Sequence, residues 1–177
     1  LAALEDLEDI SIVAAPGASA DAVTGPGVIR QLIGHAERMR YRIAVLDSVE
    51  GMLPAEVRAL RGAIDSTRAA LYYPWVVVDD PLADGEPREL LLPPSGFVSG
   101  IYARNDAERG VHKAPANEVV RLASNFEFLI NQRQQEALNP EGVNCLRFFE
   151  GRGFRVWGAR TASSDPEWKY VNVRRYF

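Results

Sequence analysis

Residues 139–177 read NPEGVNCLRFFEGRGFRVWGARTASSDPEWKYVNVRRYF, and this stretch contains three short runs rich in Val, Phe, Tyr and Trp. Gly, Pro, Ser and Asp separate the runs, a pattern that predicts strands at Val143–Phe149, 153–160 and 169–177. The segment EGRG at 150–153 predicts a tight reversal between the first two strands, because glycine tolerates the backbone conformations of such turns. We therefore expect a small C-terminal β-sheet region.

Three nearly continuous apolar runs precede this stretch: DISIVAA at 9–15, YRIAVLD at 41–47 and RAALYYPWVVVD at 68–79. Such runs predict strands that are buried on both faces. Between them, apolar residues at helical spacing predict one helix over about 27–40 and another that begins at Pro54, where proline is well tolerated. The order strand-helix-strand-helix-strand predicts an α/β fold whose parallel-sheet core (β-α-β-α-β) is flanked by helices.

Several positions are expected to fill the core. Pro74 within the third run predicts a bulge, an edge, or a strand that begins only at Trp75. Trp75 and Trp157 are expected to be large core anchors. Ser95 is predicted to cap a further helix that ends near Glu108. The helix positions predicted to face the core are Val28, Ile29, Leu32, Ile33, Ala36, Leu53, Val57, Leu60, Ile64, Phe97, Val98, Ile101 and Tyr102.

The composition places the chain among folded, soluble proteins. Its 177 residues are 47% hydrophobic and 25% charged, with a formal net charge of −4, and we expect residues 1–177 to form a single domain. The charge argues against general nucleic-acid binding, which usually needs a basic face. No apolar run approaches the roughly 20 residues that cross a bilayer, so we expect no membrane insertion. The one cysteine, Cys145, cannot form an internal disulfide and is expected to be a small buried residue.

Three aspartates at predicted strand ends offer the best evidence for an enzyme. Asp47 ends the second predicted strand, and Asp79 and Asp80 end the third. Ligands of open parallel sheets bind at the carboxyl ends of strands, where carboxylates could hold Mg²⁺ for phosphoryl transfer. Alternatively, these residues form strand-ending turns by hydrogen-bonding their own backbone. We favour turns.

No other pattern indicates chemistry. The connection GASADAVTGPG at 17–27 lacks the spacing of a phosphate-binding loop, so we interpret it as a simple connection. His35 and His112 are isolated and make no metal set with the one cysteine. We therefore expect no catalytic, cofactor-binding or metal-binding residues in this chain.

The predicted C-terminal sheet carries five arginines. They are Arg152, Arg155, Arg160, Arg174 and Arg175. Arginines on the outer face of a strand keep an edge soluble and discourage pairing with other strands. They could also pair with acidic groups on a neighbouring subunit, such as those of the segment ALEDLEDI at 3–10. The residues alone favour neither interpretation.

Several blocks of the chain resemble, in the same order, the tail sheath proteins of contractile phage tails and related contractile injection systems. The blocks are ALEDLEDISIVAAPG at 3–17, LYYPWVVVDDP at 71–81, PPSGFVSGIYARNDAERGVHKAPAN at 93–117, LNPEGVN at 138–144, GRGFRVWGART at 151–161 and DPEWKYVNVRRYF at 165–177. None is a catalytic signature, but together they cover nearly the whole chain.

The resemblance implies a structural subunit, not an enzyme, with no cofactor. Such proteins stack as hexameric rings around an inner tube and contract to drive the tube through a target envelope. The implied partners are other sheath subunits, the tail tube protein, and baseplate and terminator proteins. The implied place is a phage tail or phage-tail-like particle whose parts are made in the bacterial cytoplasm. The resemblance also favours subunit contacts for some of the five arginines. Because the chain begins with Leu1 and sheath proteins continue beyond the position of Phe177, we expect a fragment that lacks the terminal arms.

Overall fold

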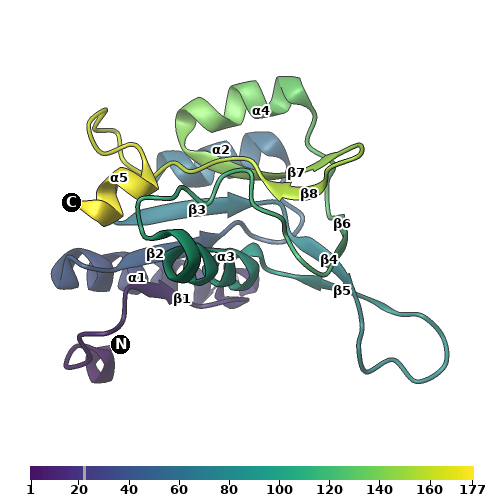
Figure 1. Ribbon diagram of the computed structural model, residues 1–177, viewed down its shortest axis with the longest axis horizontal. Helices are drawn as coiled ribbons and strands as arrows, with labels where there is room; N and C mark the ends of the chain where they lie inside the picture. Colours follow the sequence, from purple (N-terminus) through teal and green to yellow (C-terminus); the bar gives the residue numbers. More distant parts are fainter. Residues whose placement is uncertain (22) are drawn as a thin grey trace.

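The computed structural model describes residues 1–21 and 23–177. A five-stranded main sheet in the order β1-β2-β3-β7-β8 lies beside a three-stranded small sheet in the order β5-β4-β6 (Figure 1). The strands are β1 (Ile12–Ala14), β2 (Ile43–Asp47), β3 (Ala69–Tyr73), β4 (Val76–Asp79), β5 (Glu89–Leu92), β6 (Ala123–Phe126), β7 (Val143–Phe149) and β8 (Gly153–Val156). The helices are α1 (Gly25–Met39), α2 (Pro54–Gly62), α3 (Pro94–Arg109), α4 (Gln132–Leu138) and α5 (Val171–Tyr176), with short 3₁₀ turns η1 (Ala2–Leu4), η2 (Ala18–Ala20) and η3 (Asn139–Glu141). None of these helices, over the residues described, is long and apolar enough to cross a bilayer.

The main sheet is mostly parallel. Strands β1, β2, β3 and β7 run in the same direction, and β8 returns antiparallel to β7. Strands β2 and β3 are buried at every position, which explains their uninterrupted apolar sequence, because other elements cover both faces of the sheet. The predicted α/β fold with a parallel core flanked by helices is confirmed.

Alternate residues of the main sheet belong to two separate cores. Ala44 and Leu46 of β2 face a core shared with α1, α2 and α4, whereas Ile43 and Val45 face a core shared with α3 and the small sheet. Figure 1 shows α3 in front of the main sheet and α1 and α2 behind it. The predicted core-facing helix positions are buried or half-buried with one exception: Leu53 is 55% exposed, because it precedes the first residue of α2.

The apolar run at 68–79 forms two strands in different sheets. Strand β3 ends at Tyr73 within the main sheet, and β4 begins at Val76 in the small sheet, where it pairs antiparallel with β5 and β6. Pro74, which has no N–H to donate to a strand partner, lies between them. One continuous strand over 68–79 is therefore wrong, and so is a strand that begins only at Trp75, because β3 precedes Pro74 and β4 begins after it, at Val76.

The C-terminal part differs most from its prediction. Strands β7 and β8 form one side of the main sheet, and the expected strand at 153–160 ends at Val156. The expected strand at 169–177 is wrong, because residues Val171–Tyr176 form helix α5. Val171 packs into the core on the α3 side of the sheet. Tertiary packing decides the conformation of so short a segment, since an isolated helix of this length would be unstable.

The two tryptophans singled out as anchors differ in burial. Trp75 is 3% exposed, and its Nε1 donates a hydrogen bond to the Ser48 carbonyl at 2.9 Å. The expectation for Trp157 is wrong, since this side chain is only half-buried and packs against Phe149, with 4.5 Å between ring centroids. Cys145 is fully buried as predicted, and burial raises the pKa of its thiol to about 12.

Candidate functional site

Asp47, at the end of β2, is buried against the beginning of α3. Ser95 donates two hydrogen bonds to its carboxylate, from the backbone N to Oδ1 at 2.6 Å and from Oγ to Oδ2 at 2.7 Å. Burial raises the pKa of Asp47 to about 6, although these hydrogen bonds act in the opposite direction. The predicted role of Ser95 as a helix cap is wrong, because α3 already begins at Pro94. The Asp47 carboxylate instead accepts a free N–H of the first helical turn.

Asp79 and Asp80 do not join Asp47 at the edge of the main sheet. Asp79 ends β4 in the small sheet, opposite Glu89 of β5. The Asp80 side chain accepts a hydrogen bond from the backbone N–H of Leu82, two residues further along the chain, at 2.9 Å. This is the turn conformation that the sequence favours. Within the described part of the chain, no three His, Cys, Asp or Glu residues are grouped as a metal ion requires. The carboxylates of the phosphoryl-transfer alternative are therefore not brought together.

Two of the five arginines hold a loop against β8. Arg155 Nη1 donates to the Asn117 carbonyl at 2.7 Å, and Arg152 Nη2 donates to the Asn117 side chain at 2.6 Å. Arg152 also stacks over the ring of Trp157 at 5.6 Å. Both arginines thus attach Asn117, the last residue of the resembling block at 93–117, to the end of the main sheet. Both hydrogen bonds lie at the surface of the molecule.

The other three arginines follow β8 in the chain. Arg160 follows β8 and lies over the Tyr170 ring at 5.4 Å. Arg174 and Arg175 belong to α5, where Arg174 stacks over Trp168 at 4.4 Å. Arg175 forms a two-pronged ion pair with Asp106 of α3, with Nη1 and Oδ1 2.9 Å apart. The expectation that all five decorate one small sheet is wrong, and their role in subunit contacts stays a prediction.

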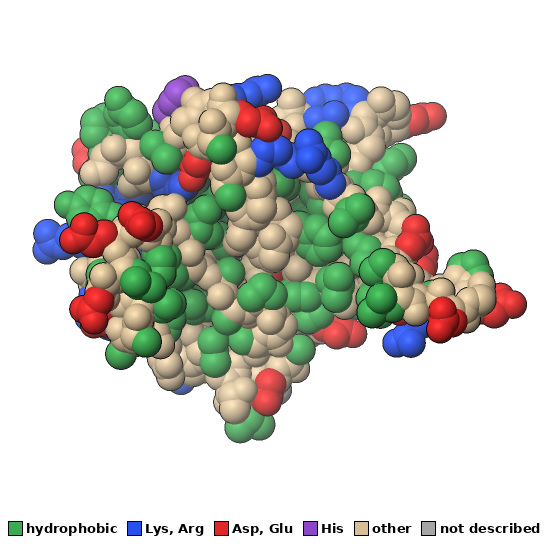
Figure 2. All heavy atoms as spheres, turned by 60° about the horizontal axis from the view of Figure 1, so that its bottom comes forward, with side chains coloured by type: hydrophobic (Ala, Val, Ile, Leu, Met, Phe, Trp, Pro, Cys, Tyr) green, Lys and Arg blue, Asp and Glu red, His purple; other side chains and the backbone are tan. Residues whose placement is uncertain are grey.

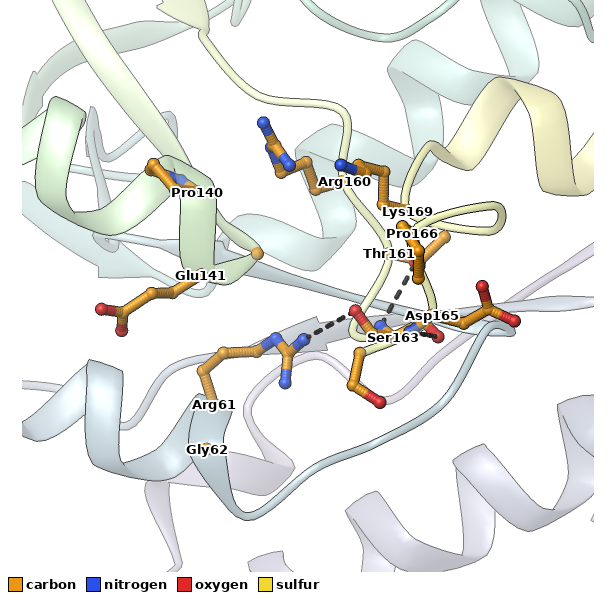
Figure 3. Close-up of a pocket in the computed structure, with 12 residues that line it drawn as sticks. Arg61, Gly62, Pro140, Glu141, Arg160, Thr161, Ser163, Asp165, Pro166 and Lys169 are labelled. Carbon is orange, nitrogen blue, oxygen red and sulfur yellow. Dashed lines mark hydrogen bonds between the residues drawn. The ribbon is translucent and has the colours of Figure 1, made fainter.

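A polar cavity of about 350 Å³ opens between α2, η3 and the chain that precedes α5 (Figure 3). Three cationic side chains line it: Arg61, Arg160 and Lys169. Arg61 is only 8% exposed; its Nη1 donates to the Ile64 carbonyl at 2.6 Å and its Nη2 to the Ser163 carbonyl at 3.4 Å. Burial lowers the pKa of Arg61, which is the expected effect of desolvating a cation.

Only some of the residues that line this cavity could be selected from the sequence. Arg160 is among the predicted interface residues. Lys169 lies in the resembling block at 165–177 without a predicted role, and Arg61 lies in none of the blocks. One signal was available in Gly142 of the block LNPEGVN. Its φ is +88°, and a Cβ there would lie 2.8 Å from Arg61 Nε and 2.9 Å from the Thr161 carbonyl oxygen. Only glycine allows this close approach without a shift of its neighbours.

Residues from different resembling blocks contact each other in the folded chain. Asn144 of β7 is fully buried, and its side chain joins three segments. Its Nδ2 donates to the carbonyls of Leu71 (3.2 Å) and Arg160 (2.7 Å), and its Oδ1 accepts the Arg160 N–H at 2.7 Å. Gly158 packs directly on it: a Cβ at Gly158 would lie 2.7 Å from Asn144 Oδ1. These motif residues build the fold, and no catalytic role is needed to explain them.

One buried arginine binds the backbone of the acidic N-terminal segment. Arg42, at the start of the second apolar run, donates through Nε to the Ile10 carbonyl at 3.1 Å, and through Nη2 to the carbonyls of Leu4 at 2.8 Å and Leu7 at 2.5 Å. Its Nη1 lies 2.5 Å from His35 Nε2. His35 is therefore a structural partner of Arg42, and burial together with this guanidinium lowers the pKa of the imidazole.

Comparison with known proteins gives a consistent result. Residues 1–162 match the family model of the phage tail sheath protein central domain. The chain is 30% identical to the tail sheath protein of Burkholderia phage BcepMu over 148 residues, which are 76% of this chain and 30% of that protein. It is 34% identical, with a TM-score of 0.76, to a chain of the anti-feeding prophage helical sheath in its contracted state, covering 98% of this chain and 45% of that one. For the sheath complex of the extracellular contractile injection system PVC, also contracted, the identity is 32%, the TM-score 0.76 and the coverage 98% and 46%.

The α/β body and these similarities together define a structural protein of contractile tails. More specifically, the chain belongs to the phage tail sheath protein family, with residues 1–162 corresponding to the central domain. It spans less than half the length of each relative described above.

Proposed function

We propose that this chain is the central body of a sheath subunit that assembles as stacked hexameric rings around an inner tube. The observation that carries the proposal is the match of residues 1–162 to the sheath central domain together with a TM-score of 0.76 to a contracted sheath. The partners would be further sheath subunits, the tail tube protein, and the baseplate and terminator proteins of the particle. Synthesis would take place in the bacterial cytoplasm.

In this proposal the subunits contract by rearranging as rigid bodies. The chain offers a body with two cores that share one central sheet, and such packed cores resist continuous deformation. Contraction would then be a two-state change in how whole subunits pack against each other, driven by surface that is better buried afterwards. Neither nucleotide hydrolysis nor a bound metal is needed for this step.

Some of the five C-terminal arginines would contribute to subunit contacts in this proposal. Arg152, Arg155, Arg160 and Arg174 have no carboxylate partner within 4 Å among the described residues. Arg175 differs, because Asp106 of its own chain already balances its charge. A surface ion pair contributes only about 0–1 kcal/mol, but the same pair repeated in every subunit of a long assembly can decide how the subunits pack.

Electron microscopy of the full-length protein tests the proposal. We expect long hollow cylinders with sixfold rings and, in the presence of the tube protein, a filled central channel. A full-length protein that stays monomeric at high concentration would contradict it.

Calorimetry with Mg²⁺ and a nucleotide tests the absence of phosphoryl-transfer chemistry. We expect no heat of binding and no turnover. Binding that disappears in an Asp47→Asn variant would instead support the enzyme alternative.

A further inference from the structure

The cavity of Figure 3, which we call the basic cavity, contains more positive charge than its own chain balances. Arg61, Arg160 and Lys169 line it, and none of them has a carboxylate within 4 Å among the described residues. The Nε atoms of Arg61 and Arg160 are also buried, and neither has a hydrogen-bond partner among the described residues. Buried donors of charged groups are costly to leave unpaired, so the site favours an acceptor that comes from outside the chain.

The two carboxylates in the lining are already engaged elsewhere. Both oxygens of Glu141 accept hydrogen bonds from Arg58 on α2, and Figure 3 shows its carboxylate pointing away from Arg160 and Lys169. Asp165 Oδ1 accepts the backbone N–H of Glu167 at 2.9 Å. The cations are therefore available to a further anionic group.

A segment with complementary charge projects from the opposite end of the molecule. The connection between β4 and β5, residues 80–88 (DPLADGEPR), extends away from the body (Figure 1), and acidic side chains lie at its tip (Figure 2). We call it the acidic loop. Asp84 and Glu86 are exposed and have no ion-pair partner among the described residues. Asp80 and Arg88 pair with each other at its base, 3.6 Å apart.

The loop and the cavity are too far apart to meet within one chain. In Figure 1 the segment before α5 lies at one end of the long axis and the acidic loop at the other. Complementary surfaces at opposite ends make a head-to-tail contact, which repeats in rings or helices instead of closing as a pair. We propose that the acidic loop of one copy inserts Asp84 or Glu86 into the basic cavity of a second copy. This inference rests on the proposed function as a self-assembling subunit.

Charge reversal in the full-length protein tests the contact. One variant carries Asp84→Lys and Glu86→Lys, a second carries Arg160→Glu and Lys169→Glu, and a third combines all four changes. The measurement is the critical concentration for assembly, taken by sedimentation. Each double reversal places like charges together and should raise the critical concentration about tenfold or more. The combined variant restores opposite charges and should return within about threefold of the wild type.

Matched reversals at other exposed positions control for net charge. They are Glu108→Lys with Glu136→Lys, and Arg121→Glu with Arg133→Glu, and we expect neither pair to change assembly by more than about twofold. Circular dichroism checks that the cavity variant is folded; the loop variant changes only exposed side chains, so it tests the contact even if the cavity variant unfolds.

The outcomes separate this inference from the function on which it rests. If the wild type assembles and the loop reversal assembles equally well, the contact is wrong while the sheath function stands. If both reversals weaken assembly but their combination does not rescue it, the two sites do not meet. If the wild type forms no assembly at all, both proposals fail.

Discussion

Gly158 packs against Asn144, both residues lie in the resembling blocks, and this contact can be tested directly. A Cβ at Gly158 would lie 2.7 Å from Asn144 Oδ1 and 2.8 Å from its Cα. Asn144 cannot move away, because its side chain holds the backbone of Arg160 and Leu71. We expect Gly158→Ala to lower the free energy of unfolding by about 1–3 kcal/mol, as overpacked cores do, measured by urea denaturation.

Gly100, within α3, provides the matched control. A Cβ at this position meets no atom within 4 Å. Alanine is the better helix former, so Gly100→Ala should raise stability by roughly 0.4–1 kcal/mol. Equal effects of the two substitutions would show that the Asn144 contact is not the cause.

The buried carboxyl of Asp47 should make stability depend on pH in an unusual direction. Burial raises its pKa from 3.8 to about 6, so between these values the folded state binds a proton that the unfolded state does not. The contribution of Asp47 is therefore fully present below about pH 3.8 and is lost as the pH rises through about 6. Two pKa units correspond to on the order of 3 kcal/mol at most.

Comparison with an Asp47→Asn variant isolates this contribution. Other carboxylates have lowered pKa values, among them Glu118 beside Lys113 and Glu141 beside Arg58, and these destabilise the fold as the pH falls. The stability of the wild type minus that of the variant should nevertheless increase from pH 7.5 to pH 4. A constant difference would refute the raised pKa of Asp47.

At the scale of an element, Arg42 decides whether the acidic N-terminal segment stays on the body. Its guanidinium binds three backbone carbonyls of this segment, those of Leu4, Leu7 and Ile10. Arg42→Met keeps much of the side-chain volume but removes every one of these donors. We expect amide hydrogen exchange of residues 1–10 to become at least about tenfold faster, corresponding to the loss of about 1.4 kcal/mol or more of local stability.

Arg38 is the natural control for Arg42. It reaches the same segment through an exposed ion pair with Glu5 at 3.0 Å, and exposed pairs contribute little. Arg38→Met should therefore leave the exchange rates of residues 1–10 within about threefold of the wild type. If both variants release the segment equally, its attachment depends on general surface charge and not on the buried donors.

Burial on both faces made the strands of the main sheet predictable. Strands β2 and β3 read as apolar runs, and α1 shows its buried face at Leu32 and Ala36. Helix α5 could not be predicted in the same way. Its sequence VNVRRY alternates as a strand does, while its conformation depends on Val171 in the core and on the pairing of Arg175 with Asp106 of α3. Both contacts join segments that are distant in sequence, so no local pattern contains them.

The candidate site was even less predictable than α5. Arg160 could be selected because it ends the predicted strand 153–160, but the basic cavity also needs Arg61, which lies 102 residues before its hydrogen-bond partner Ser163. Asp79 can be grouped with Asp47 only if residues 68–79 form a strand of the same parallel sheet as β2. Once Pro74 separates β3 from β4, the two aspartates belong to different sheets. A single break in strand pairing thus separates the carboxylates on which the phosphoryl-transfer alternative depends.

At the scale of the whole molecule, the two cores should unfold together, because they share the same strands. Leu46 and Val45 are neighbours in β2, yet they pack into opposite cores. Loss of either core therefore exposes the sheet that supports the other. We expect Leu32→Ala, on the α1 side, and Phe126→Ala, in the small sheet, to lower the free energy of unfolding by about 2–5 and 3–5 kcal/mol respectively.

Both substitutions should shift one common transition. Trp75 lies in the chain between β3 of the main sheet and β4 of the small sheet. Tryptophan fluorescence, to which Trp157 and Trp168 also contribute, and far-ultraviolet circular dichroism should report the same midpoint, as in two-state unfolding. Leu129→Ala, at a position that is 61% exposed, should change stability by no more than about 0.5 kcal/mol. If Phe126→Ala instead produced a separate early transition with the helical signal intact, the small sheet would be able to detach from the body. The subunit could then deform internally during contraction, and the rigid-body account of sheath movement would have to be abandoned.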